Sequence, residues 1–310
     1  MKRLLLPLLA AFLILSGCGK MKPPTPAAQM SVDAFLKQFN LRVAPQPERF
    51  QVKVPASWDV PLGAYPEGMY WGLAAEFARD AGFDLTRVKG QTADVWRYEL
   101  PGGLPGQGEQ SQFTYPSTAI LLVQNEKVVG AWLAFNKHTV GPSVKGRYLE
   151  EVTGLPFERW VEKQGYFTAA GPNADLAKLG PVEVVATFAD AVSKGDRTRA
   201  VACMDPVALR DVLTMNLEPG RLYNPDFGEN NSLAHNIVRA QVLTAKMLDP
   251  DTPADEIRDI GARTRVELRL FMELKWRQQV FNTPDNRTTR FAILQKWPFG
   301  WKLGGLGTGP

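Results

Sequence analysis

The sequence predicts an α+β protein of two small domains, each with an antiparallel sheet packed by helices. The chain has 310 residues, which is longer than the size at which a single hydrophobic core usually stops growing. With 45% apolar residues and eight tryptophans, it can bury a core. Stretches with helical periodicity accompany stretches in which apolar and polar residues alternate. This alternation is typical of antiparallel strands that have one wet face.

The first 17 residues are predicted to be a signal peptide that does not belong to the fold. Lys2 and Arg3 form a basic start, and the apolar run over 4–15 is too short for a spanning helix, which needs about 20 residues. The segment Leu15-Ser16-Gly17-Cys18 resembles a bacterial lipobox. The resemblance implies that Cys18 carries a diacylglyceryl group and anchors the protein to the extracytoplasmic face of the cell membrane. A plain secretory signal is the alternative.

Residues 18–30 are expected to form a tether, because this stretch contains several prolines and few apolar side chains. Cleavage would remove Lys2 and Arg3 and take the basic count from 36 to 34, against 32 acidic residues. A nearly neutral chain would be held at the membrane by lipid rather than by attraction to anionic head groups. The small and interspersed charge also argues against nucleic acid as a partner.

The first domain is predicted to span residues 31–168. A glycine- and proline-rich stretch over 101–110 predicts a loop, and its glycines lack the strand-to-helix setting of a phosphate-binding loop. In chain order, the patterns predict a helix over 32–39 capped by Ser31, a strand over 50–54, a helix over 69–81 ended by Gly82, a strand over 95–100, a hairpin of strands over 119–123 and 128–135, and a short helix that begins at Pro156 and ends at Gly165.

Three segments of this domain resemble an uncharacterised domain found in lipoproteins of spore-forming Gram-positive bacteria. They are FLKQFNLRV at 35–43, AGFDLTRVKG at 81–90 and ILLVQNEKVVGAW at 120–132. The likeness covers most of residues 31–135. It rests mainly on core and turn residues, and it implies no activity.

The second domain is predicted to span residues 178–310, with helices first and strands after them. Apolar residues at every second position from Val266 to Trp276 give the clearest strand pattern in the chain. In order, the patterns predict helices over 182–192, 198–203 and 206–215, with Asp196 and Asp205 as caps of the second and third, then long strands over 236–248 and 262–281, and a final hairpin of 290–296 and 301–303.

This order of elements is similar to the cystatin-like cone fold of the nuclear-transport-factor-two superfamily. More narrowly, VVATFADAVSKGDRTRAVACM at 184–204 and GWKLGGLGTGP at 300–310 resemble a second uncharacterised lipoprotein domain. The resemblance implies a cone in which helices lie over a concave sheet and can leave a pocket. Some members of the superfamily use this pocket for catalysis and many use it for binding.

The candidate pocket residues are few. A cone-fold enzyme needs an acid/base pair, and His235, Asp226, Tyr223 and Asp190 are the candidates, with Trp276 a further candidate for the lining. His235 follows a polar stretch, so an exposed or strand-edge histidine is the alternative interpretation, and the same holds for His138. Since the inward face of the clearest strand is apolar, a catalytic pocket would need polar groups from loops.

Two other features have plain structural explanations. Cys203 lies among small apolar residues on a predicted helix, where a lone thiol is usually a buried hydrophobe. Five acidic residues fall in a predicted loop between strands, but they lack the glycine turn and terminal glutamate of a calcium-binding loop, and helix capping behind Thr252 explains them. We therefore predict neither a metal nor a cofactor. The five are Asp249, Asp251, Asp255, Glu256 and Asp259.

Two functions remain open at this point. The first is a membrane-anchored, non-catalytic binding or protein-interaction module at the cell envelope, favoured by the lipobox, the tether and the lack of a convergent catalytic set. The alternative is a cone-fold hydrolase or isomerase that acts on a small apolar molecule. A solute-transporter receptor is disfavoured, because the chain lacks the repeated strand-helix alternation of a two-lobed parallel fold.

Overall fold

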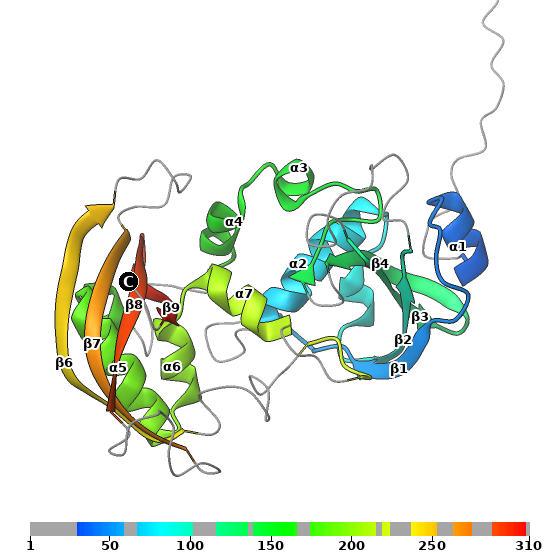
Figure 1. Cartoon of the computed structure of the whole chain (residues 1–310). Coiled ribbons are helices and arrows are strands. Elements are labelled where there is room, and N and C mark those ends of the chain that lie inside the picture. The colour runs from blue at the N-terminus through cyan, green and yellow to red at the C-terminus, as the bar shows by residue number, and fades with distance from the viewer. Residues whose placement is uncertain are drawn as a thin grey trace, which may run out of the picture.

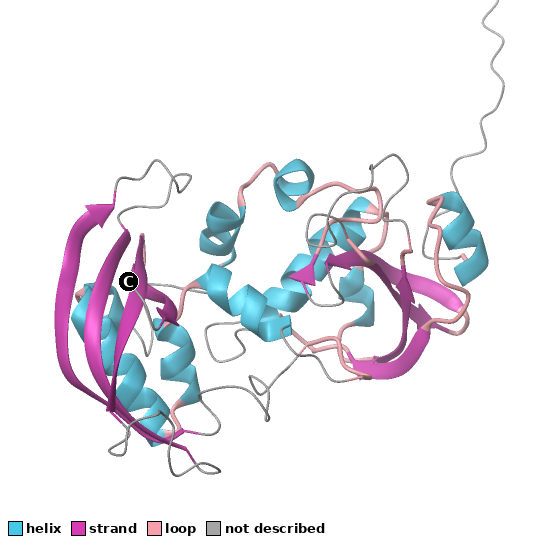
Figure 2. Ribbon diagram, viewed as in Figure 1, coloured by secondary structure: helices cyan, strands magenta, loops and turns pink. Residues whose placement is uncertain are grey.

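The computed structural model describes residues 30–58, 67–101, 116–135, 139–165, 174–214, 219–223, 237–252, 263–274 and 287–307. In these residues the protein is α+β, with a five-stranded and a four-stranded antiparallel sheet, each accompanied by helices (Figures 1 and 2). In both sheets the strands lie side by side in chain order. The predicted fold class is therefore confirmed.

The first sheet contains the predicted hairpin at its centre. Its strands β3 and β4 meet at a two-residue turn in which Asn125 and Glu126 have φ angles of 48° and 62°. Positive φ at both turn residues matches the right-handed twist of the strands on either side. The strands are β1 (Glu48–Lys53), β2 (Thr92–Glu99), β3 (Thr118–Gln124), β4 (Lys127–Phe135) and β5 (Thr139–Val140).

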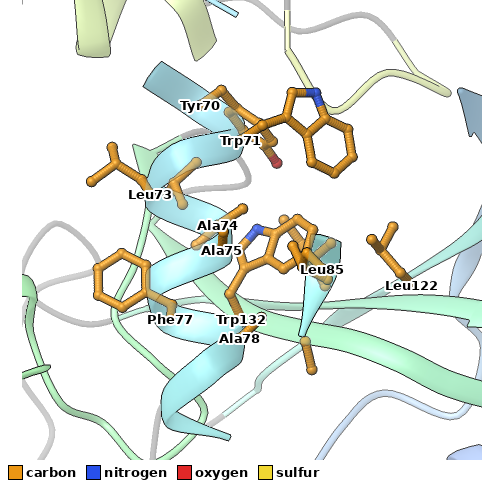
Figure 3. Packing of buried hydrophobic residues seen from close by; sticks show 14 of the residues in the cluster. Tyr70, Trp71, Leu73, Ala74, Ala75, Phe77, Ala78, Leu85, Leu122 and Trp132 are labelled. Carbon is orange, nitrogen blue, oxygen red and sulfur yellow. The ribbon is translucent and has the colours of Figure 1, made fainter. Parts of the chain in front are cut away.

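The helix α2 (Glu67–Asp80) is buried on almost all sides and packs on this sheet. Gly130 of β4 allows the Leu85 side chain to approach the sheet closely, because a Cβ at position 130 would lie 2.4 Å from that side chain. Figure 3 shows side chains of α2 packed with those of Leu85, Leu122 and Trp132. The other helical elements of this half are α1 (Val32–Gln38), which Ser31 caps as predicted, the 3₁₀ turn η3 (Leu85–Val88), α3 (Leu149–Thr153) and α4 (Phe157–Gln164).

The helices of the second half begin where their capping residues predict. The Asp196 side chain accepts a hydrogen bond from the Arg199 amide, and the Asp205 side chain accepts one from the Val207 amide at 2.7 Å. Gly195 ends the preceding helix in the left-handed conformation at φ 68°. These elements are η4 (Ala174–Lys178), α5 (Pro181–Lys194), α6 (Arg197–Cys203) and α7 (Pro206–Thr214).

The second sheet consists of β6 (Ile237–Thr252), β7 (Arg263–Leu274), β8 (Arg287–Trp297) and β9 (Gly300–Gly307). The predicted strand over 262–281 is confirmed as far as Leu274, and residues 275–286 lie outside the described part of the chain. The final hairpin turns at Pro298 and Phe299 as predicted.

One prediction about this sheet is wrong. Asp249 and Asp251 were expected in a loop, whereas β6 continues to Thr252 and pairs with the start of β7. Pairing places Asp249 opposite Arg265 and Thr252 opposite Arg263, with a register shift that passes over Pro250. An edge strand tolerates proline, because the missing amide can face away from the neighbouring strand. Asp255, Glu256 and Asp259 lie outside the described residues.

Two clusters of buried apolar side chains form the core. The first lies between α2 and the five-stranded sheet, and the second lies between α5, α6 and the four-stranded sheet. The first cluster also includes Leu209 of α7, Leu222, and the hairpin residues Trp297 and Phe299. Side chains from beyond residue 178 thus complete the core of the first half. The domain limits at 168 and 178, and the cystatin-like cone, stay predictions.

Candidate functional site

The structure describes only part of the predicted pocket set. Tyr223 lies against α2 in the first core cluster, whereas Asp190 lies on α5 and pairs with Lys194 at 2.8 Å in an exposed position. The two residues therefore do not converge. Cys18, His138, Asp226, His235 and Trp276 lie outside the described residues.

Tyr223 is part of an aromatic junction, by which we mean Trp58, Tyr70, Trp71, Trp132 and Tyr223. The Trp71 indole N–H donates a hydrogen bond of 3.2 Å to the Tyr223 hydroxyl, and the ring centroids of Tyr70 and Tyr223 lie 5.0 Å apart. Trp71 and Trp132 meet edge to face at 6.3 Å, a favoured geometry for aromatic pairs. Figure 3 shows Tyr70, Trp71 and Trp132 gathered along α2.

A polar clamp next to the junction holds the segment that carries Tyr223. The Glu48 carboxylate of β1 accepts a hydrogen bond of 2.6 Å from the Gly220 amide. Arg97 of β2 donates to the same carboxylate through Nε at 2.9 Å and to the Arg221 carbonyl oxygen through Nη1 at 3.0 Å. Arg97 is buried, so its charge is balanced where water cannot reach it. The clamp therefore fixes residues 220–223 to the first sheet.

The phenols of the junction are held in their neutral form. Burial raises the pKa of Tyr223, and the Trp71 indole that donates to its hydroxyl offsets only part of this rise. Burial also raises the pKa of Tyr70. Neither phenol is available as a general base near neutral pH, since both keep their protons there.

A second group of buried ionisable residues lies where α6 and α7 meet the β8–β9 hairpin. The Asp205 carboxylate caps α7 through Oδ1 and accepts a hydrogen bond of 2.8 Å from the Trp297 indole through Oδ2. The Lys302 ammonium of β9 donates to the Ala202 carbonyl oxygen in the last turn of α6. A cation at a helix C-terminus and an anion at an N-terminus both oppose the partial charges of the helix ends. The group therefore locks two helix ends onto one hairpin.

The chemistry of this second group is also structural. Burial lowers the pKa of Lys302 to about 8 and raises the pKa of Cys203 to about 11. Cys203 is 1% exposed, so its thiol is both protonated near neutral pH and shielded from solvent. This placement agrees with the prediction of an inert, buried cysteine rather than a nucleophile.

A third polar cluster fixes the loop after β5 to the end of α2. Asp80 accepts a hydrogen bond of 2.7 Å from the Ser143 hydroxyl and one of 2.6 Å from Arg147. The Ser143 oxygen also accepts from the backbone amides of Lys145 and Arg147 at 3.3 Å. Since Ser143 is fully buried, its hydroxyl orders the loop and is not open to a substrate.

The described residues contain no group of three or more His, Cys, Asp or Glu residues placed to hold a metal ion. Among the described helices, none is long and apolar enough to cross a membrane. The expected absence of a metal or cofactor stays a prediction.

Sequence reasoning missed the polar clamp and Lys302, and a signal was present only for the clamp. Arg97 takes the same phase in β2 as the buried residues Ala93 and Val95, whereas Lys302 takes the opposite phase in β9 to the buried Leu303. A charged residue in the inward phase of a strand needs a buried partner. The backbone carbonyls that Arg97 and Lys302 meet belong to segments 124 and 100 residues away in the chain.

Comparison with known proteins yields one family match. Residues 35–133, from α1 through β4, match the family model described as a domain of unknown function, DUF4830. No curated protein and no solved structure matches the chain. The match agrees with the resemblance of this stretch to an uncharacterised domain. The matched residues 35–133 contain most of the first sheet and all of α2.

Proposed function

We propose that the protein is a membrane-anchored lipoprotein that acts as a non-catalytic binding or protein-interaction module on the extracytoplasmic face of the cell envelope. The observation that carries the proposal is the segment Leu15-Ser16-Gly17-Cys18 directly behind a short apolar run. Two or three acyl chains on Cys18 hold far better than a single chain, which binds membranes only marginally.

The tether is long enough to lift the folded part off the bilayer. The first described residue is Met30, twelve positions after Cys18. At about 3.5 Å for each extended residue, the tether reaches roughly 40 Å. The anchor therefore leaves the folded surfaces free to meet partners close to the membrane.

The roles of the buried ionisable groups support a non-catalytic module. Arg97 pairs with Glu48, Asp205 caps α7, and Lys302 caps α6. A catalytic acid or base must instead be within reach of a substrate. The buried cluster between α5 and the second sheet consists of apolar side chains packed together.

Metabolic labelling with palmitate tests the anchor. We expect label and membrane fractionation for the wild-type chain and for Cys203→Ala, since Cys203 is buried core. Cys18→Ser should lose both, because the thioether has no site to form. Label that persists in Cys18→Ser would contradict the proposal.

Complementation tests the absence of catalysis. In a strain that lacks the gene, Asp226→Ala and His235→Ala should restore any envelope defect as well as the wild type does, because neither residue serves as an acid or base. Loss of function in either variant at normal protein level would instead favour the hydrolase.

A further inference from the structure

The two faces of the second sheet differ sharply. One face is covered by α5 and α6 and contributes Ala240, Ala292, Leu294 and Leu303 to the second core cluster. The residues in the opposite phase of β6 and β8 are exposed, and we call their side of the sheet the open face. Its exposed side chains are Arg239, Gln241, Thr244 and Lys246 of β6, and Arg287, Thr289 and Ile293 of β8.

Strand register confirms that these residues belong to one surface. Through β7, Thr244 is in line with Thr289, Lys246 with Phe291, and Gln241 with Arg287. Residues that pair directly across antiparallel strands point to the same side of the sheet. Gln295 and Trp297 continue the phase of Ile293 in β8 toward the β8–β9 turn, but both are buried. The open face therefore ends at Ile293.

Basic charge is concentrated in this sheet. Its four strands contain nine Arg and Lys residues against four Asp and Glu residues. After loss of the signal peptide the chain has 34 basic and 32 acidic residues, so the rest of the mature chain is slightly acidic. The near-neutral total therefore hides a basic sheet, and three of its cations, Arg239, Lys246 and Arg287, are exposed on the open face. Register also places two acidic residues on this face, Glu273 opposite Arg239 and Glu267 opposite Lys246.

One apolar side chain of the open face is exposed near the end of the face that lies toward the β8–β9 turn. Ile293 is 40% exposed and is one of two large hydrophobic residues with high exposure in the described part of the chain. Its neighbour in β9 is Gly305, around which a Cβ would meet no atom within 4 Å. A sheet face with exposed cations and one exposed apolar side chain at its end suits a surface of anionic head groups.

We propose that the open face of the second sheet docks on the anionic phospholipid surface in which Cys18 is anchored. The inference rests on the proposed function, because the lipid anchor makes the bilayer a permanent neighbour within reach of the tether. The lipid anchor would then fix the protein to the membrane, and the open face would fix its orientation. Each exposed cation near an anionic surface adds to the attraction, and salt screens it.

Vesicle flotation tests this docking without the lipid anchor. The chain that begins at Gly19 keeps every described residue and is mixed with vesicles of phosphatidylcholine, alone or with about one third phosphatidylglycerol. We expect binding only to the anionic vesicles, with loss at high salt. The variant Arg239→Gln/Lys246→Gln/Arg287→Gln should bind at least about tenfold more weakly, since each cation contributes about a factor of five.

The matched control is Lys37→Gln/Arg42→Gln/Lys127→Gln, which removes three exposed cations from the first half. It should bind like the wild type. Equal binding to neutral vesicles, full binding by the open-face variant, or an equal loss in the control would each overturn the docking proposal. Because the tested chain has no Cys18, this result is independent of the palmitate experiment, so the two proposals fail separately.

Discussion

Three buried charged side chains in the described part of the chain each form a hydrogen bond with a backbone group. Arg97 donates to the Arg221 carbonyl, Asp205 accepts from the Val207 amide, and Lys302 donates to the Ala202 carbonyl. An unsatisfied buried polar group costs about 1–3 kcal/mol. These residues therefore stabilise the fold through hydrogen bonds to the backbone.

The buried Lys302 makes stability depend on pH. Its pKa falls from 10.5 to about 8 on folding, because burial disfavours the ammonium. Between these values the unfolded chain binds more protons than the folded protein, so the free energy of unfolding should rise with pH. Cys203 acts in the opposite direction above pH 9, since burial raises its pKa from 9.0 to about 11 and the folded state keeps a proton that the unfolded chain loses.

Chemical denaturation can isolate the lysine. In a Cys203→Ala background, the free energy of unfolding should rise by about 1 kcal/mol between about pH 7.5 and about pH 9. Adding Lys302→Met should remove most of this rise, because a methionine in that position does not titrate. An equal rise in both proteins would show that Lys302 is not its source.

At the residue scale the sequence predicts local chemistry well. Ser31, Asp196 and Asp205 are identified as caps because a cap depends only on the next few residues. Arg97 and Lys302 are not identified, because their partners come from distant segments that only the fold brings near.

At the element scale, β6 is an edge strand whose outer backbone groups need protection. The Ser193 hydroxyl of α5 accepts a hydrogen bond of 2.6 Å from the Ala240 amide and lies 2.7 Å from the Ala240 carbonyl oxygen. A helix side chain thus occupies one amide and one carbonyl of the strand edge. Such cover opposes pairing with another chain at that point.

We expect Ser193→Ala to expose this edge. The variant should lose about 1–2 kcal/mol of stability, since the Ala240 amide loses its acceptor. Hydrogen exchange at that amide should become faster, while Ser193→Thr, which keeps a hydroxyl, should retain protection. Unchanged exchange in the alanine variant would mean that Ser193 does not protect the edge.

Helices and strands whose apolar period extends over many residues are predicted correctly, and elements of five residues or fewer are missed. The helix α2 and the strand β7 extend over enough residues for their periods to be evident. The turn η3, the helix α3 and the strand β5 have five residues or fewer, which is too short for a period. The end of β6 is misjudged because pairing with β7, and not local sequence, keeps the strand going through Pro250.

At the scale of the whole molecule, the described contacts join the two sheets through α7 and the segment at 219–223. Leu209 and Leu222 enter the first core cluster, and α7 also contacts β9 (Figure 1). The Glu48 carboxylate then ties the Gly220 amide to β1. This arrangement predicts that both sheets unfold together.

Hydrogen exchange in increasing denaturant tests this coupling. Peptides from β3–β4 and from β8–β9 should lose protection at the same denaturant concentration in the wild type. Glu48→Ala should destabilise the protein by about 2–3 kcal/mol, because buried Arg97 loses its carboxylate, and should separate the two midpoints. Asp190→Ala, which breaks an exposed ion pair, should change neither the stability nor the two midpoints. Widely separate midpoints in the wild type would refute the coupling.

Function at this scale is only partly visible in the sequence. The segment 15–18 that resembles a lipobox is local and can be recognised directly, whereas the basic open face depends on strand register across β6, β7 and β8. The total charge hides this face, because acidic residues elsewhere compensate for it.

Mass spectrometry of the mature N-terminus, in protein extracted from its own membrane, tests the central claim most directly. We predict an N-terminal peptide that begins at Cys18, lacks residues 1–17 and carries the mass of a diacylglyceryl group. A peptide that begins elsewhere, or one with an unmodified Cys18, would contradict the account.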